Sequence, residues 1–441
     1  MGRSPIDMDK LVLDLVKADN VDEKKVLAKK ITDIAYKKGI YASSINDFYL
    51  ARGKGLTPTN FTVPAINLRV LTYDLAKAIF RCAKKNNAGA FIFEIAKSEM
   101  AYTNQPAIEY TAVILAAAVK EGWAGAVFVQ GDHFQLNAKA YKENPDKELE
   151  GTKALISHAI EAGFYNIDID SSTLVDLSKP SIKKQQEANY DVCAKLTNYI
   201  RQVQPKGIEV SVGGEIGEVG HQNSTPEDLN AFMEGYKERL RKGRTGISKI
   251  SVQTGTSHGG VVLPDGTIAK VKLDFDTLKV LSNIARETYG LAGAVQHGAS
   301  TLPSEAFGKF PEVQTAEVHL ATEFQNMVYE SKHFPKELKD RMYEWIKKNL
   351  AGEKKSDQTE EQFIYSARKK ALGPFKKDIM GLSSVTRDQI AKEIEARFEF
   401  LFEKLNIKDT KEIVSKNTVL KRVISRKGSS TKVEIDGEGA D

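Results

Sequence analysis

The sequence predicts an α/β protein: a (β/α)8 TIM barrel with extra N-terminal and C-terminal helices. Between residues 61 and 325, eight short β-rich runs alternate with helical stretches, the number of units typical of this fold. Polar residues end several of these runs, where a barrel places its active site. A doubly wound sheet with eight strands is the structural alternative. The runs span residues 62–68, 90–96, 125–133, 165–172, 208–217, 249–259, 293–300 and 316–322.

The N-terminal extension, residues 1–60, is mostly polar and helical in its pattern. Apolar residues within 11–16 and 26–35 predict two short amphipathic helices. Glycine and proline residues between 53 and 58 end this pattern before the first β-rich run. We therefore expect a helical extension over residues 1–60 and a catalytic barrel over residues 61–330.

Further helices are predicted after the barrel, over residues 331–404. Spacings of four, four and three keep one helical face apolar at Ile390, Ile394, Phe398 and Leu401. Residues 416–427 carry five basic residues and no acid, and several acids follow them. We interpret residues 405–441 as a solvated or poorly ordered tail.

The composition is that of an ordinary globular protein. Of 441 residues, 41% are hydrophobic and 28% are charged, and the net charge is only +5, so nucleic-acid binding is not expected. Cys82 and Cys193 do not form a metal-type pair, and we interpret them as core thiols in a reducing compartment. There is no signal-peptide pattern, and no run reaches the ~18 apolar residues of a membrane span. We expect a cytoplasmic protein without a membrane partner.

Acidic residues and histidines lie at the ends of four predicted strands. They are Asp132, His133, Glu215, His258 and His297. Three of the seven histidines in the chain therefore occupy equivalent positions, and they converge on one space if the barrel closes. Three imidazoles and a carboxylate form a ligand set for Zn²⁺ or a similar divalent ion. The alternative is that these are unrelated core or surface histidines.

Small residues follow two of these histidines. Gly259 and Gly260 come after His258, and Gly298 and Ser300 come after His297. Glycine lets the backbone approach a ligand closely, and the last loops of a barrel are its usual phosphate site. These positions therefore predict phosphate binding, unless the glycines serve only as turn residues.

Five motifs in fixed order give a more specific indication. They are GDH at 131–133, GEIG at 214–217, STPEDL at 224–229, TGTSHGG at 254–260 and HGAS at 297–300. Each motif alone is weak, but the ordered set resembles the class II, metal-dependent, fructose-bisphosphate aldolase family over about residues 60–330. Residues 363–379 are also similar to the helical C-terminal part of some longer members.

The resemblance implies a role for each matching residue. His133, His258 and His297 would hold a catalytic zinc or another divalent metal, with Glu215 as a movable carboxylate ligand. Asp132 would be the acid/base beside the aldehyde end of the substrate, and Glu218 would move the proton of the ketose. His221, in the same loop as Glu218, could share that role. The remaining matches to substrate and phosphate contacts are Asn67, Asp170, Gly259, Gly298, Ser300, His319 and Thr322.

The family activity is the reversible aldol cleavage of a phosphorylated ketose. We therefore expect fructose 1,6-bisphosphate as the substrate, with dihydroxyacetone phosphate and glyceraldehyde 3-phosphate as products. The resemblance also implies a monovalent cation and a homo-oligomer, either a dimer or a tetramer.

Departures from the family pattern leave the substrate open. The last strand usually carries an asparagine and an acid where this chain has His319 and Ala321, and a serine is common where it has Ala96. The alternatives are another ketose such as tagatose 1,6-bisphosphate, or a non-catalytic metal-binding relative. A Schiff-base aldolase needs a lysine at a strand end. Lys97 is the near candidate, since Lys249 begins its predicted strand.

Overall fold

The computed structural model describes residues 6–217, 222–255 and 273–423. Within them, eight parallel strands close into a barrel in the order β2-β3-β4-β5-β6-β7-β8-β9, with β9 pairing back to β2. All eight runs predicted from the sequence form these strands, so the barrel prediction is confirmed. The strands are β2 (Val63–Asn67), β3 (Ile92–Ala96), β4 (Gly125–Gln135), β5 (Asn166–Asp170), β6 (Ser211–Gly217), β7 (Lys249–Val252), β8 (Ala294–Gln296) and β9 (Glu317–Leu320).

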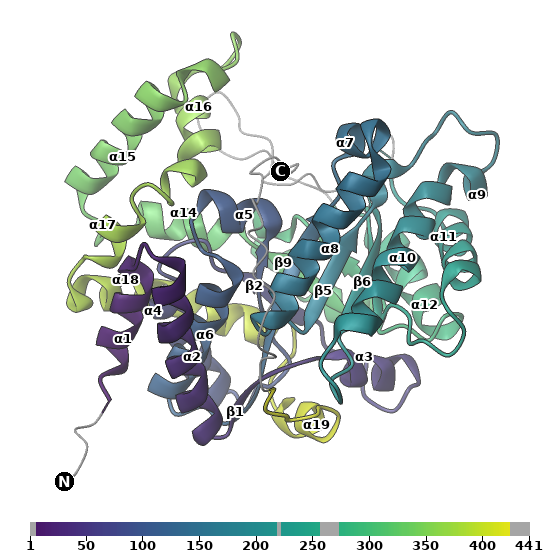
Figure 1. Cartoon of the computed structure of the whole chain (residues 1–441), viewed down its shortest axis with the longest axis horizontal. Coiled ribbons are helices and arrows are strands. Elements are labelled where there is room, and N and C mark those ends of the chain that lie inside the picture. Colours follow the sequence, from purple (N-terminus) through teal and green to yellow (C-terminus); the bar gives the residue numbers. More distant parts are fainter. Residues whose placement is uncertain (1–5, 218–221, 256–272, 424–441) are drawn as a thin grey trace.

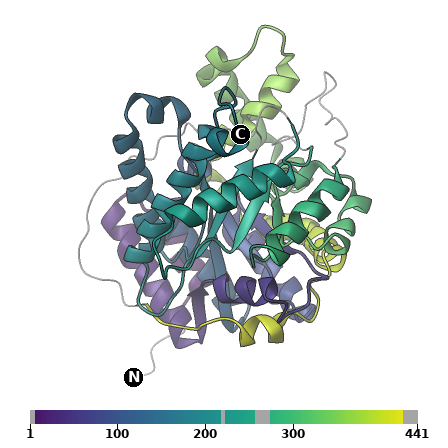
Figure 2. The same ribbon diagram turned by 90° about the vertical axis from the view of Figure 1, so that its right-hand side faces the viewer.

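Helices pack around the outside of the ring (Figure 1 and Figure 2). None of those in the described residues is long and apolar enough to cross a membrane. The first eleven are α1 (Met8–Lys17), α2 (Val21–Lys37), α3 (Asn46–Gly53), α4 (Thr72–Lys85), α5 (Lys97–Tyr102), α6 (Ala107–Lys120), α7 (Ala138–Glu143), α8 (Pro145–Glu161), α9 (Ile182–Gln185), α10 (Glu187–Val203) and α11 (Pro226–Arg239). The others are α12 (Phe275–Glu287), α13 (Lys309–Glu312), α14 (Thr322–Glu330), α15 (Lys336–Asn349), α16 (Glu360–Ala367), α17 (Lys376–Met380), α18 (Ser384–Lys404) and α19 (Lys411–Lys416).

The N-terminal extension contains a strand that the sequence pattern did not predict. Strand β1 (Ile40–Ser43) follows α2 and pairs in parallel with residues 125–128 of β4, below the level at which β4 joins β3. Ile40 and Ala42 are buried. A four-residue strand between helices carries too few alternating positions for its period to be seen.

The C-terminal helices are held to the barrel by α18. Its predicted apolar face, which includes Ile394 and Phe398, is fully buried. Arg81 of α4 pairs with Glu395 of α18 at 2.6 Å. Figure 1 shows α15 and α16 standing at the end of the barrel where α5 and α7 follow their strands.

The opposite end of the barrel is closed by Arg52 of α3. Its guanidinium is fully buried and donates hydrogen bonds to the carbonyls of Phe61 at 2.9 Å and Ala292 at 3.0 Å. It also donates to the carbonyls of Thr59 and Thr315. Burial lowers the pKa of Arg52 to about 10, so it remains charged at neutral pH. One side chain therefore joins the starts of β2, β8 and β9.

We predict that Arg52→Met lowers the free energy of unfolding by at least about 3 kcal/mol, because several buried carbonyls lose their only charged donor. Urea unfolding followed by circular dichroism measures this. Arg341→Met, at an exposed position on α15, is the matched control and should change stability by less than about 0.5 kcal/mol. Equal stabilities of the two variants would contradict the closing role of Arg52.

Candidate active site

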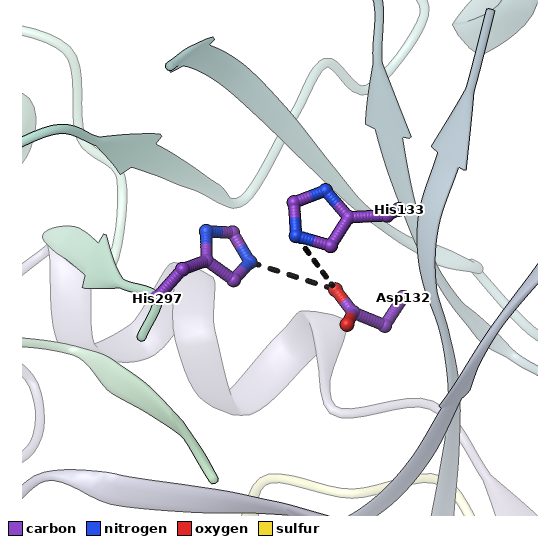
Figure 3. Close-up of side chains that lie close together, drawn as sticks. All are labelled: Asp132, His133 and His297. Carbon is purple, nitrogen blue, oxygen red and sulfur yellow. Dashed lines mark ion pairs between the residues drawn. The ribbon is translucent and has the colours of Figure 1, made fainter. Parts of the chain in front are cut away.

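A bulge in β4 explains why an acid and a histidine stand side by side at a strand end. Neighbouring residues of a regular strand point to opposite faces. The register of β4 against β5 shifts between Gly131 and Phe134, and His133 has a positive φ of 40°. A bulge of this kind re-aims a side chain. Asp132 and His133 therefore both face the mouth of the barrel (Figure 3).

Asp132 lies between two imidazole rings (Figure 3). Its Oδ1 is 3.5 Å from Nε2 of His297, which follows β8, and 3.9 Å from Nε2 of His133. The two ring centroids are 4.3 Å apart. The predicted convergence of strand-end histidines thus occurs for His133 and His297, and His258 lies outside the described residues.

Two carboxylates reach the same rings from the neighbouring strands. Oε2 of Glu215, on β6, lies 3.4 Å from Nδ1 of His133, and its Oε1 lies 4.0 Å from Nδ1 of His297. Oδ2 of Asp170, at the end of β5, lies 3.1 Å from Nδ1 of His133. Asp170 also accepts hydrogen bonds from Ser172.

These side chains fit a divalent cation. Asp132, His133 and His297 offer ligand atoms that lie within 4.8 Å of one another, and so do His133, Asp170 and Glu215. Imidazole nitrogens with carboxylate oxygens are the donor set of zinc and similar ions.

Burial and the neighbouring charges together set the protonation of this cluster, and Asp132 and Glu215 raise the pKa of His133 well above its ordinary value although burial opposes the shift. It lowers the pKa of His297 well below the ordinary value, helped by the nearby His319 and His133, so His297 is neutral as a metal ligand must be. Burial and the charge of Asp170 raise the pKa of Glu215 to about 8. Burial opposes ionisation of Asp170, but hydrogen bonding and the charge of His133 outweigh it and lower its pKa to about 2.

His319 lies below this cluster, inside the barrel. The sequence predicts a substrate contact there, but only 4% of the residue is exposed. Its Nδ1 is 3.2 Å from Oδ1 of Asp132 and 3.1 Å from Oε2 of Glu94, on β3. Its Nε2 is 2.7 Å from Oε1 of Glu317.

Lys249 lies deeper still. Its ammonium is 2.9 Å from Oδ2 of Asp168 and 2.7 Å from Oε1 of Gln130, and it also contacts Glu317. A Cβ at Gly213 would lie 2.3 Å from Oδ1 of Asp168, so only glycine leaves room for this group. Burial raises the pKa of Asp168 to about 6 although Lys249 opposes the shift.

The sequence interpretation missed this interior network. Its members are Glu94, Gln130, Asp168, Lys249 and Glu317. The available signal was a period of two: Asp168 precedes Asp170 by two positions, and Glu317 precedes His319 by two. Residues two apart on a strand share a face, so the inner partners of the strand-end residues could have been identified.

The predicted substrate contacts at the mouth have partners within the protein. Nδ2 of Asn67 donates to Glu99, which also pairs with Arg69 at 2.5 Å. Arg69 donates to the hydroxyl of Thr322 at 3.4 Å.

The loop after β8, which the sequence predicts to bind phosphate, uses one of its predicted contact residues within the protein. Oγ of Ser300 accepts the N–H of Ala321 at 2.8 Å, and Gly298 has a positive φ of 68°. The other predicted positions in the loops after β6 and β7 lie outside the described residues. They are Glu218, His221, Gly259 and Gly260.

Comparisons with known proteins give a family for the chain and structures of similar fold. The family model described as fructose-bisphosphate aldolase class-II matches residues 56–401. No protein of curated function matches the chain. A probable tagatose 6 phosphate kinase from Sinorhizobium meliloti is similar in fold, with a TM-score of 0.55 and 14% identity, and the match covers 80% of this chain and 99% of that one.

Two further solved structures are similar at lower TM-scores. The fructose-bisphosphate aldolase from Campylobacter jejuni has a TM-score of 0.49 and 18% identity, covering 84% of this chain and 96% of that one. A putative fructose-1,6-bisphosphate aldolase from Coccidioides immitis has a TM-score of 0.41 and 19% identity, covering 77% of this chain and 96% of that one.

We predict that Lys249→Met lowers the free energy of unfolding by about 3–5 kcal/mol at pH 7.5, because Asp168 and Glu317 lose their buried counter-charge. The loss should shrink as the pH falls toward 5.5, since unpaired buried carboxylates have raised pKa values and become protonated. Urea unfolding at both pH values measures this. Lys195→Met on the exposed face of α10 is the control, and a loss that grows at low pH would contradict the prediction.

Proposed function

The chain belongs to the class II fructose-bisphosphate aldolase family, and from this premise we propose that it cleaves a ketose bisphosphate reversibly. Fructose 1,6-bisphosphate is the first candidate, giving dihydroxyacetone phosphate and glyceraldehyde 3-phosphate. The observation that carries the proposal is the position of Asp132, whose Oδ1 lies within 3.9 Å of a nitrogen of both His133 and His297. An acid/base thus stands beside a pair of potential metal ligands.

In this proposal His133, His297 and Glu215 hold a divalent cation, zinc or a similar ion, with His258 as the remaining imidazole. When bound, the cation supplies Lewis-acid polarisation of the substrate carbonyl. Asp170 orients the ring of His133 through its contact at Nδ1. Such outer partners fix the tautomer and the orientation of a ligand.

Two carboxylates would divide the proton transfers. Asp132 protonates and deprotonates the oxygen of the aldehyde product, and Glu218 moves the proton at the ketose carbon. Each transfer by a positioned side chain contributes about 10²–10⁴-fold to the rate. Backbone N–H groups at Gly259, Gly298 and Ser300 bind phosphate, as glycine-rich loops of this fold do.

The predicted substrate contacts at the mouth leave two sugars as candidates. Asn67 and Arg69 both donate to Glu99 there, and Arg69 donates to Thr322. Ala96 and Ala321 offer no side-chain hydrogen bond to a substrate hydroxyl. This loss of polar contacts keeps tagatose 1,6-bisphosphate as an alternative. We also propose a cytoplasmic homo-oligomer, a dimer or a tetramer, with a monovalent cation near the phosphate loops.

Of the two lysines considered for the rival Schiff-base mechanism, Lys249 is unavailable and Lys97 is left for the borohydride test. The ammonium of Lys249 is enclosed by Gln130, Asp168 and Glu317 below His319. Lys97 begins α5 and is partly exposed.

We predict that removal of the metal abolishes aldol cleavage and that borohydride does not. The assay measures cleavage of fructose and tagatose 1,6-bisphosphates before and after dialysis against EDTA, with Zn²⁺ added back. Restored activity supports the metal mechanism. Full activity after complete demetallation, or inactivation by borohydride in the presence of substrate, would contradict the metal mechanism.

We predict that Asp132→Asn lowers kcat by about 10²–10⁴-fold while at least one Zn²⁺ per chain remains bound, because the substitution removes a proton-transfer group and leaves His133 and His297 in place. Steady-state kinetics and metal analysis measure the two quantities. Asp146→Asn, at an exposed position on α8, is the matched control. Unchanged turnover in Asp132→Asn would refute the acid/base role.

A further inference from the structure

A second cluster of potential metal ligands lies directly below the first. Glu94, Asp132 and His319 come from β3, β4 and β9, and they are 0%, 6% and 4% exposed. Their ligand atoms lie within 4.8 Å of one another. The ring centroids of His319 and His297 are 4.2 Å apart, so the two clusters are neighbours. Asp132 belongs to both.

Three atoms of this cluster make no hydrogen bond to any described residue, although each is fully enclosed. They are Oε1 of Glu94, Oδ1 of Asp132 and Nδ1 of His319, whereas Oε2 of Glu94, the oxygen nearest to His319, accepts a hydrogen bond from Gln130. Buried polar atoms without hydrogen bonds are rare and call for an explanation. The nitrogen lies 3.1 Å from Oε2 of Glu94 and 3.2 Å from Oδ1 of Asp132, and these two carboxylates raise the pKa of His319 well above its ordinary value although burial opposes the shift.

The contact at Nε2, the other nitrogen of His319, indicates which protonation state Nδ1 has. Nε2 is 2.7 Å from Oε1 of Glu317, and that carboxylate is held by Lys249. A histidine that binds a metal through one nitrogen almost always donates its other N–H to a carboxylate or carbonyl. In the neutral ring this bond places the proton on Nε2 and leaves the lone pair of Nδ1 directed at Glu94 and Asp132.

The spacing suits a shared ion. Ligand bonds of about 2.0–2.2 Å place two ligand atoms of one ion roughly 3.0–3.5 Å apart. We propose that Glu94, Asp132 and His319 bind a second divalent cation, Zn²⁺ or Mn²⁺, and that Asp132 bridges it to the cation of the proposed function. The inference therefore rests on the proposed function for the first ion only.

Charge balance supports the second cation. Four carboxylates lie inside the barrel, those of Glu94, Asp132, Asp168 and Glu317. Among the described residues, Lys249 is the one lysine or arginine that contacts this group. Buried charges without partners are costly. A divalent ion would neutralise the excess negative charge. Without it, protons on Glu94 and His319 would have to do so. The alternative to a second ion is a protonated, positively charged His319, and metal analysis distinguishes these two possibilities.

The second ion fixes the acid/base. The ion would hold Asp132 through Oδ1, the atom that faces both clusters, and so keep its carboxylate in one orientation toward the substrate. Pairs of catalytic metal ions lie about 3.5–4 Å apart. His319 stands where the family usually carries asparagine, so His319→Asn tests the site with the smaller residue.

The test measures bound Zn²⁺ per chain in the full-length protein after equilibrium dialysis. We expect two ions in the wild type, one in His319→Asn, one in Glu94→Gln, one in His297→Asn and none when His319 and His297 are both replaced. Affinity for the second ion should fall by more than the ~10–100-fold that loss of an outer partner costs. His333→Gln, away from the barrel interior, is the matched control and keeps both ions.

Loading with Mn²⁺ gives an independent readout. Two Mn²⁺ ions bridged by Asp132 give an exchange-coupled electron paramagnetic resonance spectrum, and His319→Asn should convert it to the spectrum of isolated ions. Circular dichroism checks that each variant folds. Glu94→Gln keeps the shape of the side chain, and it replaces His319→Asn as the test variant if His319→Asn does not fold.

The outcomes separate the two proposals. One ion in the wild type and in His319→Asn, with none in His297→Asn, overturns the second site and leaves the proposed function standing. One ion in the wild type that is lost in His319→Asn and kept in His297→Asn overturns the first site instead. Two ions that persist in both His319→Asn and Glu94→Gln place the second ion elsewhere and overturn the inference.

Discussion

Closure of eight short parallel strands into one ring is the constraint on which the rest of the molecule depends. Every second residue of each strand must then share a narrow interior without bulk water. In most barrels branched apolar residues fill that space. Here the inner positions of four strands carry Glu94, Asp168, Lys249 and Glu317, so the core under the site is held by ion pairs and hydrogen bonds.

An ionic interior of this kind imposes geometry that an apolar core does not. Each carboxylate must find a donor at hydrogen-bond distance, and Gln130 meets this need by donating to both Glu94 and Glu317. Replacing such networks by apolar residues is often neutral for stability. The network here fits a role in fixing the position of His319, because Glu317 contacts its Nε2 and Asp132 faces its Nδ1.

The sequence predicted most of the barrel because strand period and turn residues are local signals. It also predicted that strand-end residues would meet, since the ends of parallel strands share one edge. It did not predict the bulge at His133, because φ is set by the register between β4 and β5. The sequence also places Lys249 at the start of a strand, whereas its long side chain carries the ammonium to Gln130 and Asp168 inside the barrel.

The extensions at the two ends of the chain meet at one buried carboxylate. Glu109 of α6 pairs with Lys24 of α2 and with Lys376 of α17, each at 2.5 Å. Lys376 also donates to the carbonyl of Asn104, which follows α5. Removing one partner of a buried pair is costly, so these ion pairs tie α2 and α17 to α6. They thereby fix α5, whose Glu99 holds Asn67 and Arg69 at the mouth. The additions to the barrel are thus part of the support of its substrate end.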